Sequence, residues 1–151
     1  MPDVEHHVVS AILWADDGRA LLQQRDEKPG LPYAGYWTLF GGQVEADEGP
    51  DSAIRRELVE ELALHDQPLT FLERYTCPVR TRGVVVTTNH VYTGRLSRPI
   101  TSLVLFEGKA MALFTREESE QLELAFAQSP VLGRWFDWFG TAHKIANEGQ
   151  Q

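Results

Sequence analysis

The stretch that decides the fold covers residues 41–64 and reads GGQVEADEGPDSAIRRELVEELAL. Its second half predicts a helix over residues 50–62, because proline suits the first helical position and Gly49 can serve as the N-cap. Asp51 falls in the first turn, where the helix dipole favours a negative charge. Apolar residues recur every four positions and form a stripe that would face the core: Ile54, Leu58 and Leu62.

Three glutamates share one face of this helix: Glu57, Glu60 and Glu61. At about 100° per residue they lie within an arc of about 100°. Like charges at this spacing cost an isolated helix roughly a few tenths of a kcal/mol per pair, and an oxygen-rich site for Mg²⁺ or Mn²⁺ would justify that cost. Arg56 can pair with Glu60 one turn later and orient it. Taken alone, a solvated acidic face explains the same residues.

The wider spacing separates these two interpretations. Gly42 is followed by five residues and Glu48, and seven further residues lead to Arg56-Glu57, two more residues and Glu60-Glu61. This pattern resembles the Nudix box, and the preceding WTLFGGQVE of residues 37–45 resembles its usual lead-in. The box covers residues 42–64, and the order of strands and helices extends the resemblance over roughly residues 6–120.

The resemblance implies an α+β fold, namely the Nudix-like α/β/α sandwich with a mixed β-sheet. It also implies a metal-dependent hydrolase that cleaves a phosphoanhydride bond in a nucleoside diphosphate linked to another group X. Mg²⁺ or Mn²⁺ would neutralise the phosphates and activate the attacking water. Narrower alternatives remain open: an enzyme that removes damaged nucleoside triphosphates, or a Nudix-like regulatory module without turnover.

The resemblance also assigns roles to individual residues. The glutamates that match metal ligands in the family are Glu57, Glu60 and Glu61, and the carbonyl matching Gly41 often adds a ligand. The residue matching Arg56 orients a glutamate, and the one matching Glu48 braces the loop against the helix. The sequence departs from the family at Ala63, where a glycine usually ends the helix. If that position is left-handed, alanine costs roughly 1 kcal/mol there.

Four candidates lie outside the box. Arg25, at a predicted strand end, matches the place of a phosphate-contacting arginine, and Glu107 matches a late loop that often supplies a general base or extra metal ligand. Tyr33 and Trp37 could stack a nucleobase, since aromatic faces accept any base. The alternatives are a surface arginine, a loop carboxylate and, above all for Trp37, core packing.

The rest of the chain fits one domain over residues 1–151. Two β-hairpins and further strands are expected at residues 8–14, 19–25, 37–40, 69–79, 83–96 and 109–114, with a turn at residues 80–83. Thr115 and Glu118 form a capping-box pattern for a short helix, and a last helix begins at Ser129. Its four aromatic residues do not share one stripe, which leaves open a homodimer that covers some of them: Trp135, Phe136, Trp138 and Phe139.

Composition narrows the partners and the compartment. The net charge of −8 argues against a duplex nucleic-acid binder but does not exclude a small anionic substrate. The resemblance to the Nudix box implies that this partner is a small nucleotide. No apolar run approaches the roughly 18 residues of a membrane span, and the N-terminus does not resemble a signal peptide. Cys77 is the single cysteine, which is consistent with a reducing cytoplasm. The five histidines show no metal-ligand spacing.

Overall fold

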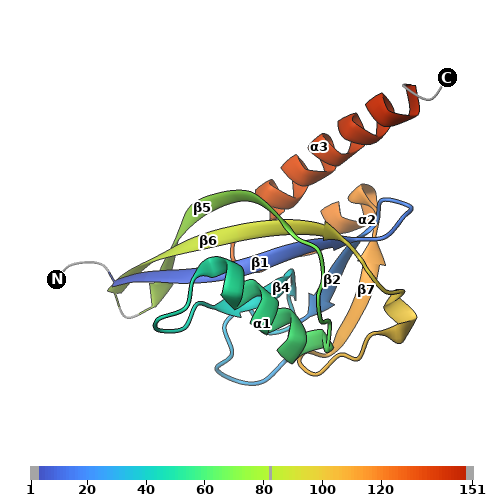
Figure 1. Cartoon of the computed structure of the whole chain (residues 1–151). Coiled ribbons are helices and arrows are strands. Elements are labelled where there is room, and N and C mark those ends of the chain that lie inside the picture. The colour runs from blue at the N-terminus through green and yellow to red at the C-terminus, as the bar shows by residue number, and fades with distance from the viewer. Residues whose placement is uncertain (1–3, 82, 149–151) are drawn as a thin grey trace.

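The computed structural model describes residues 4–81 and 83–148, whose strands form one mixed sheet (Figure 1). The strands are β1 (Val4–Trp14), β2 (Ala20–Gln24), β3 (Trp37–Thr38), β4 (Phe40–Gln43), β5 (Thr70–Thr81), β6 (Gly83–Arg95) and β7 (Ala110–Phe114). The helices are α1 (Pro50–Leu62), α2 (Arg116–Glu120) and α3 (Ser129–Glu148), with one 3-10 turn, η1 (Ile100–Ser102).

Strand β1 organises the sheet. It pairs in parallel with β6 along its whole length, and β5 follows β6 as an antiparallel edge strand. On its other side β1 pairs with β4 through residues 8–11 and meets β2 at Trp14, while β2 in turn pairs with β3 and β7. This arrangement brings the residues of β4 against the middle of β1 and beside the second half of α1.

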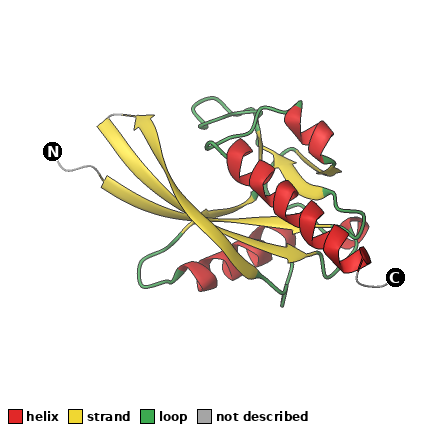
Figure 2. Cartoon of the chain, turned by 90° about the horizontal axis from the view of Figure 1, so that it is seen from above, coloured by secondary structure: helices red, strands yellow, loops and turns green. Residues whose placement is uncertain are grey.

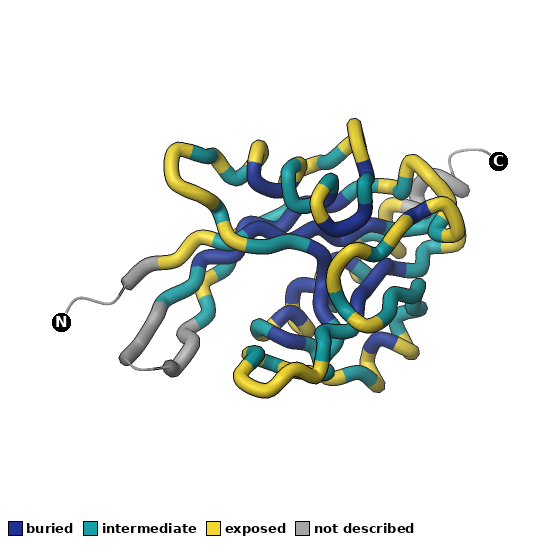
Figure 3. Tube along the Cα trace, turned by 90° about the horizontal axis from the view of Figure 1, so that it is seen from below, coloured by how far each residue is buried: buried dark blue, intermediate teal, exposed yellow. Residues whose placement is uncertain are grey.

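Two hydrophobic clusters cover the two faces of the sheet. On one face α1 buries Ile54, Leu58 and Leu62 against β1 residues such as Val9. On the other face α3 buries Leu132 and Trp135. Figure 2 views the molecule from above, with α3 in front of the sheet, and Figure 3 shows that the buried residues concentrate between the layers. The predicted α+β sandwich with a mixed sheet is confirmed.

The structure confirms the predicted bounds of α1, the predicted capping box and the spread of the α3 aromatic residues. Helix α1 has the predicted bounds, with Gly49 as N-cap and proline at its first position. The predicted capping box is present, since the Glu118 amide donates to Thr115 Oγ1 at 3.2 Å and the Thr115 amide donates to Glu118 Oε1 at 2.9 Å. In α3, Trp135 is fully buried whereas the Trp138 side chain is 52% exposed, so the aromatic residues are indeed spread around the helix.

Several strand predictions need correction. Strand β1 begins at Val4 rather than at residue 8, because β6 continues alongside it. The single strand predicted at residues 37–40 is two short strands with different partners. The turn predicted at residues 80–83 was placed too widely, since β5 runs to Thr81 and β6 starts at Gly83, and Arg82 lies outside the described residues. Among those residues no helix is long and apolar enough to cross a membrane.

Candidate active site

The glutamates of α1 face the glycine pair of β4. The Glu61 carboxylate is 4% exposed and accepts two hydrogen bonds from uncharged donors. The Gly41 amide donates to Glu61 Oε2 at 3.0 Å, and Gln23 Nε2 of β2 donates to Glu61 Oε1 at 3.3 Å. The site therefore joins three segments that are far apart in the sequence: β2, β4 and α1.

The electrostatics of these carboxylates are unfavourable without a cation. Burial, followed by the negative charge of Glu57, raises the pKa of Glu61 to about 8. Burial is also the main cause that raises the pKa of Glu57, with further contributions from Glu60 and Glu107. Carboxylates raise each other's pKa in this way when they are crowded in a poorly solvated place. Such a place favours the binding of positive charge.

Arg56 ties the N-terminal part of α1 to the loop before it. Its guanidinium donates to both oxygens of Glu48, at 2.8 and 2.9 Å, and to the Gln43 carbonyl at 2.9 Å. The same group donates to Glu57 at 3.0 Å and to Glu60 at 3.1 Å, which confirms the predicted Arg56–Glu60 pair. The hydrogen bonds from Arg56 are the main cause that lowers the pKa of Glu48 to about 2.

Two glycines allow β4 to approach its neighbours. Gly41 has φ +154°, and a Cβ on it would lie 1.9 Å from the Val9 carbonyl oxygen of β1. A Cβ on Gly42 would lie 2.4 Å from Glu57 Oε1. Any side chain at either position would force strand or carboxylate to move, so glycine is required for two separate steric reasons.

Helix α1 ends in the left-handed conformation at Ala63, with φ 52° and ψ 33°. The Ala63 amide donates to the Val59 carbonyl at 2.9 Å, and the Leu64 amide donates to the Leu58 carbonyl at 3.2 Å. This is the backbone conformation that the family glycine would adopt without strain. Alanine in it costs roughly 1 kcal/mol.

The loop that carries Glu107 is fixed to the same site. The Phe106 amide donates to the Glu61 carbonyl at 2.9 Å, and the Lys109 amide donates to the Gln24 carbonyl at 2.8 Å. Glu107 itself is exposed, and its charge contributes to the raised pKa values of Glu57 and Glu61. The charge of Glu107 therefore reaches the α1 carboxylates, while its role as a general base or metal ligand stays a prediction.

The three residues predicted to bind substrate lie in two different environments. The Arg25 guanidinium lies over the Phe126 ring at 5.1 Å, and Tyr33 packs edge-to-face on the same ring at 4.7 Å. Arg25 is also close enough for the charge of Glu61 to raise its pKa, although burial lowers it more. Trp37 packs against Phe114 at 4.9 Å on the side of the α3 core, which agrees with the alternative of core packing.

Sequence reasoning missed two residues of this site. Gln23 is 6% exposed within an apolar strand, and a polar residue in such a strand was the available signal. Phe126 has φ +55° in the segment before α3, where no pattern in the sequence indicated a contact with Arg25.

The resemblance to the Nudix box implies a divalent metal, and the residues of the site show how well they suit one. Within residues 4–81 and 83–148, no three His, Cys, Asp or Glu side chains already stand in metal-binding geometry. Arg56 occupies oxygens of Glu57 and Glu60, so these would have to turn toward a metal. The chemistry nevertheless fits a hard cation, because the buried Glu61 carboxylate has only uncharged hydrogen-bond partners.

Known proteins resemble this chain over most of its length. A family model described as NUDIX domain matches residues 4–139. The CTP pyrophosphohydrolase of Escherichia coli (strain K12) is 32% identical over 125 residues, which make up 83% of this chain and 87% of that protein.

Solved structures agree. The solution structure of the E. coli ORF135 protein covers 89% of this chain and 91% of its own, with 30% identity and a TM-score of 0.65. The MutT protein from Methanosarcina mazei Go1 covers 93% of this chain and 98% of its own, and its TM-score of 0.72 at 20% identity supports the fold. The match of the family model and the extent of the 32% identical relative show that the chain belongs to the Nudix hydrolase family.

Proposed function

We propose that this Nudix hydrolase uses Mg²⁺ or Mn²⁺ to cleave a phosphoanhydride bond in a nucleoside diphosphate linked to a group X. The observation that carries the proposal is the Glu61 carboxylate, which is buried, lies near Glu57 and Glu107, and accepts hydrogen bonds only from uncharged groups. A protein keeps such a costly arrangement where a cation binds.

The metal would be held by the carboxylates of Glu57, Glu60 and Glu61 together with the Gly41 carbonyl. When bound, it supplies charge that neutralises the phosphates and lowers the pKa of an attacking water. Because burial raises the pKa of Glu61 to about 8 in the metal-free protein, metal binding would displace a proton from this carboxyl. Arg56 would orient Glu57 and Glu60. Glu107, whose charge acts on Glu57 and Glu61, would accept a proton at the edge of the site.

The substrate would lie between the α1 glutamates and the segment around Phe126. Arg25 would contact a phosphate, and Tyr33 with Phe126 would offer ring surface to the nucleobase. Trp37, which packs against Phe114, would contribute to substrate binding indirectly, by holding the segment that carries Tyr33 in position. The likeness to a CTP pyrophosphohydrolase makes pyrimidine nucleoside triphosphates the first candidates, with X then a phosphate group. The single cysteine supports a cytoplasmic setting.

The test is a substrate panel with separate Mg²⁺ and Mn²⁺ arms. Nucleoside triphosphates, nucleotide sugars, dinucleoside polyphosphates and nucleotide cofactors are incubated with the protein, and the phosphorus-containing products are identified by ³¹P NMR. We expect turnover of at least one class into a nucleotide and a phosphate or pyrophosphate fragment. Saturable binding of these ligands without any product, in both metals, would overturn the proposal in favour of a regulatory binding module.

A further inference from the structure

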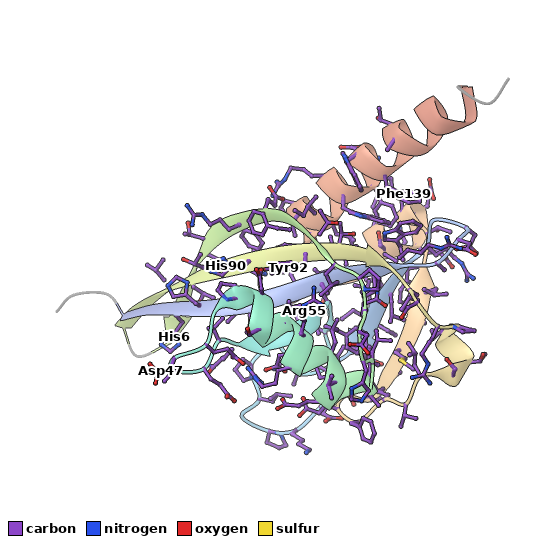
Figure 4. The ribbon with its side chains drawn as sticks, in the orientation of Figure 1. His6, Asp47, Arg55, His90, Tyr92 and Phe139 are labelled. Carbon is purple, nitrogen blue, oxygen red and sulfur yellow. The ribbon has the colours of Figure 1, made fainter. Side chains whose placement is uncertain are left out.

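A groove lies at the N-terminal end of α1, and none of Glu57, Glu60 and Glu61 lines it. A cavity of about 680 Å³ lies between the first turn of α1 and strands β5 and β6, and one of about 500 Å³ continues beneath the loop before α1. The two cavities share Pro50 and His90, so they form one groove around the helix end. Figure 4 shows His90 and Tyr92 on β6 beside this end of α1.

The groove contains an arginine whose positive charge is not paired with a carboxylate of any described residue. Arg74 of β5 lies directly opposite His90 of β6, is exposed, and has no hydrogen bond or ion pair to any described residue. Burial lowers the pKa of His90, and the charges of His7 and Arg74 lower it further. An arginine without a carboxylate is unexpected in a chain with a net charge of −8. The arrangement is suited to an anion.

The two histidines form a fixed pair at the centre of the groove. His7 Nδ1 and His90 Nε2 are 3.0 Å apart, and the rings stack with their centroids at 5.3 Å. His90 is 8% exposed, so its ring is surrounded by the neighbouring strands rather than by solvent. The imidazole edge beside Arg74 therefore has a defined position.

An exposed aromatic ring lies at the other end of the larger cavity. Phe71 is 52% exposed and packs edge-to-face on Tyr92 at 5.6 Å. The Tyr92 hydroxyl donates to the Asp51 carboxylate in the first turn of α1, which ties the two side chains together. Phe71 therefore presents an open ring face on a rigid support, and such a face stacks well on a nucleobase.

We propose that this groove binds a nucleoside monophosphate at a second site, with its phosphate on Arg74 and His90 and its base on Phe71. The cavity volumes lie within the roughly 300–1,000 Å³ that suit such ligands. The smaller cavity is also lined by Glu48, which holds Arg56. A bound nucleotide would therefore touch the loop that orients the α1 glutamates.

The test follows the histidine ring signals by NMR in excess chelator, so that no metal is present. Cytidine 5′-monophosphate, inorganic phosphate and cytidine are titrated separately. We expect the monophosphate to shift the His7 and His90 signals saturably, and phosphate and cytidine to bind more weakly. The His65 ring, which lies outside the groove lining, should not respond in the same way.

Two variants separate the contacts. Arg74→Gln should weaken both the monophosphate and phosphate at least about tenfold, whereas Phe71→Ala should weaken the monophosphate about tenfold and leave phosphate unchanged. The matched controls Arg98→Gln and Trp138→Ala, at exposed residues elsewhere, should change neither affinity. All four side chains are exposed, and melting temperatures confirm folding.

The proposal fails if His90 shows no saturable shift, or if Arg74→Gln leaves the affinities unchanged. It also fails if Arg25→Ala abolishes the shift, which would place the nucleotide at the catalytic site. Glu61→Gln is expected to keep this binding while losing turnover, so failure here and failure of the proposed hydrolysis are distinguishable.

Discussion

The two ends of α1 carry carboxylates in opposite electrostatic conditions. Toward the N-terminus, Glu48 of the preceding loop receives two hydrogen bonds from Arg56, and its pKa falls to about 2. Toward the C-terminus, Glu61 receives hydrogen bonds only from Gln23 and the Gly41 amide, and its pKa rises to about 8. The charge of a glutamate is thus balanced by an arginine at one end of the helix, whereas a glutamate at the other end has only uncharged hydrogen-bond partners.

This difference separates a carboxylate whose charge stabilises the fold from one whose charge destabilises it. A carboxylate with a permanent arginine partner stabilises the fold at neutral pH, because its charged form is favoured in the folded state. A buried carboxylate without such a partner destabilises the fold unless a proton or a cation is added. The C-terminal end of α1 is therefore where a ligand with positive charge has most to contribute.

Removal of metal should have the largest effect. Excess chelator is expected to abolish turnover of any good substrate, and Mg²⁺ or Mn²⁺ should restore it, because the carboxylates alone cannot neutralise a phosphate. The measurement is the initial rate before and after chelation. Undiminished turnover in chelator would show that the C-terminal end of α1 works without a cation.

Glu61→Gln and Glu48→Gln test the two ends directly. Glu61→Gln, and likewise Glu57→Gln, should lower kcat by at least about 10²-fold, as expected when a group that positions metal charge is lost. The metal-free Glu61→Gln protein should melt at the same or a higher temperature than the wild type. Glu48→Gln should melt at a lower temperature with or without metal. Equal activity in wild type and Glu61→Gln would mean that Glu61 does not position a catalytic metal.

The difference in the free energy of unfolding between Glu61→Gln and the wild type should depend on pH. Because its folded pKa of about 8 lies above the ordinary 4.5, the stability it contributes is present at low pH and is lost as pH rises from 4.5 to 8. In chelator, the free energy of unfolding of Glu61→Gln should therefore rise relative to that of the wild type across this range, by on the order of a few kcal/mol. Denaturant unfolding at pH 5 and pH 8.5 measures the gain, and a constant difference would contradict it.

Arg25→Ala should have an intermediate effect. Loss of a phosphate contact is expected to raise KM or lower kcat by about tenfold, with the melting temperature nearly unchanged. Steady-state kinetics on the best substrate measures this, and Arg98→Ala is a matched exposed control. Wild-type kinetics would leave Arg25 as a residue that only packs on Phe126.

Ala63→Gly should have the smallest effect. Glycine relieves the left-handed strain at φ 52° but adds freedom to the unfolded chain, so a gain of up to about 1 kcal/mol is expected. Thermal and denaturant unfolding measure it, and turnover should not change. A loss of stability would mean that the helix end holds alanine without strain.

Local sequence predicted local structure well in this chain. The bounds of α1 followed from Pro50, Gly49 and the apolar stripe, since these signals act within a few residues. The spacing of Arg56 and Glu60 likewise predicted their contact, because residues four apart on a helix are neighbours.

Contacts between distant segments could not be derived in the same way. The parallel pairing of β1 with β6 depends on which strands meet in space, and no residue of either strand specifies its partner alone. Gln23 meets Glu61 across 38 positions of sequence, and Arg25 meets Phe126 through the segment before α3. The resemblance to the Nudix box supplied the roles of the glutamates, whereas the structure supplied the partners that set their charge.

The hydrogen bond from Gly41 to Glu61 makes one backbone amide sensitive to the charge on the Glu61 carboxylate. Because the Gly41 amide donates directly to Glu61 Oε2, its NMR chemical shift senses whether that oxygen carries a proton, a negative charge or a metal. In the metal-free protein this resonance should titrate with a midpoint near the Glu61 pKa of about 8. Addition of Mg²⁺ at fixed pH should then move it without any change of side chain, which allows the protonation and metallation of a single carboxylate to be followed in the unmodified enzyme.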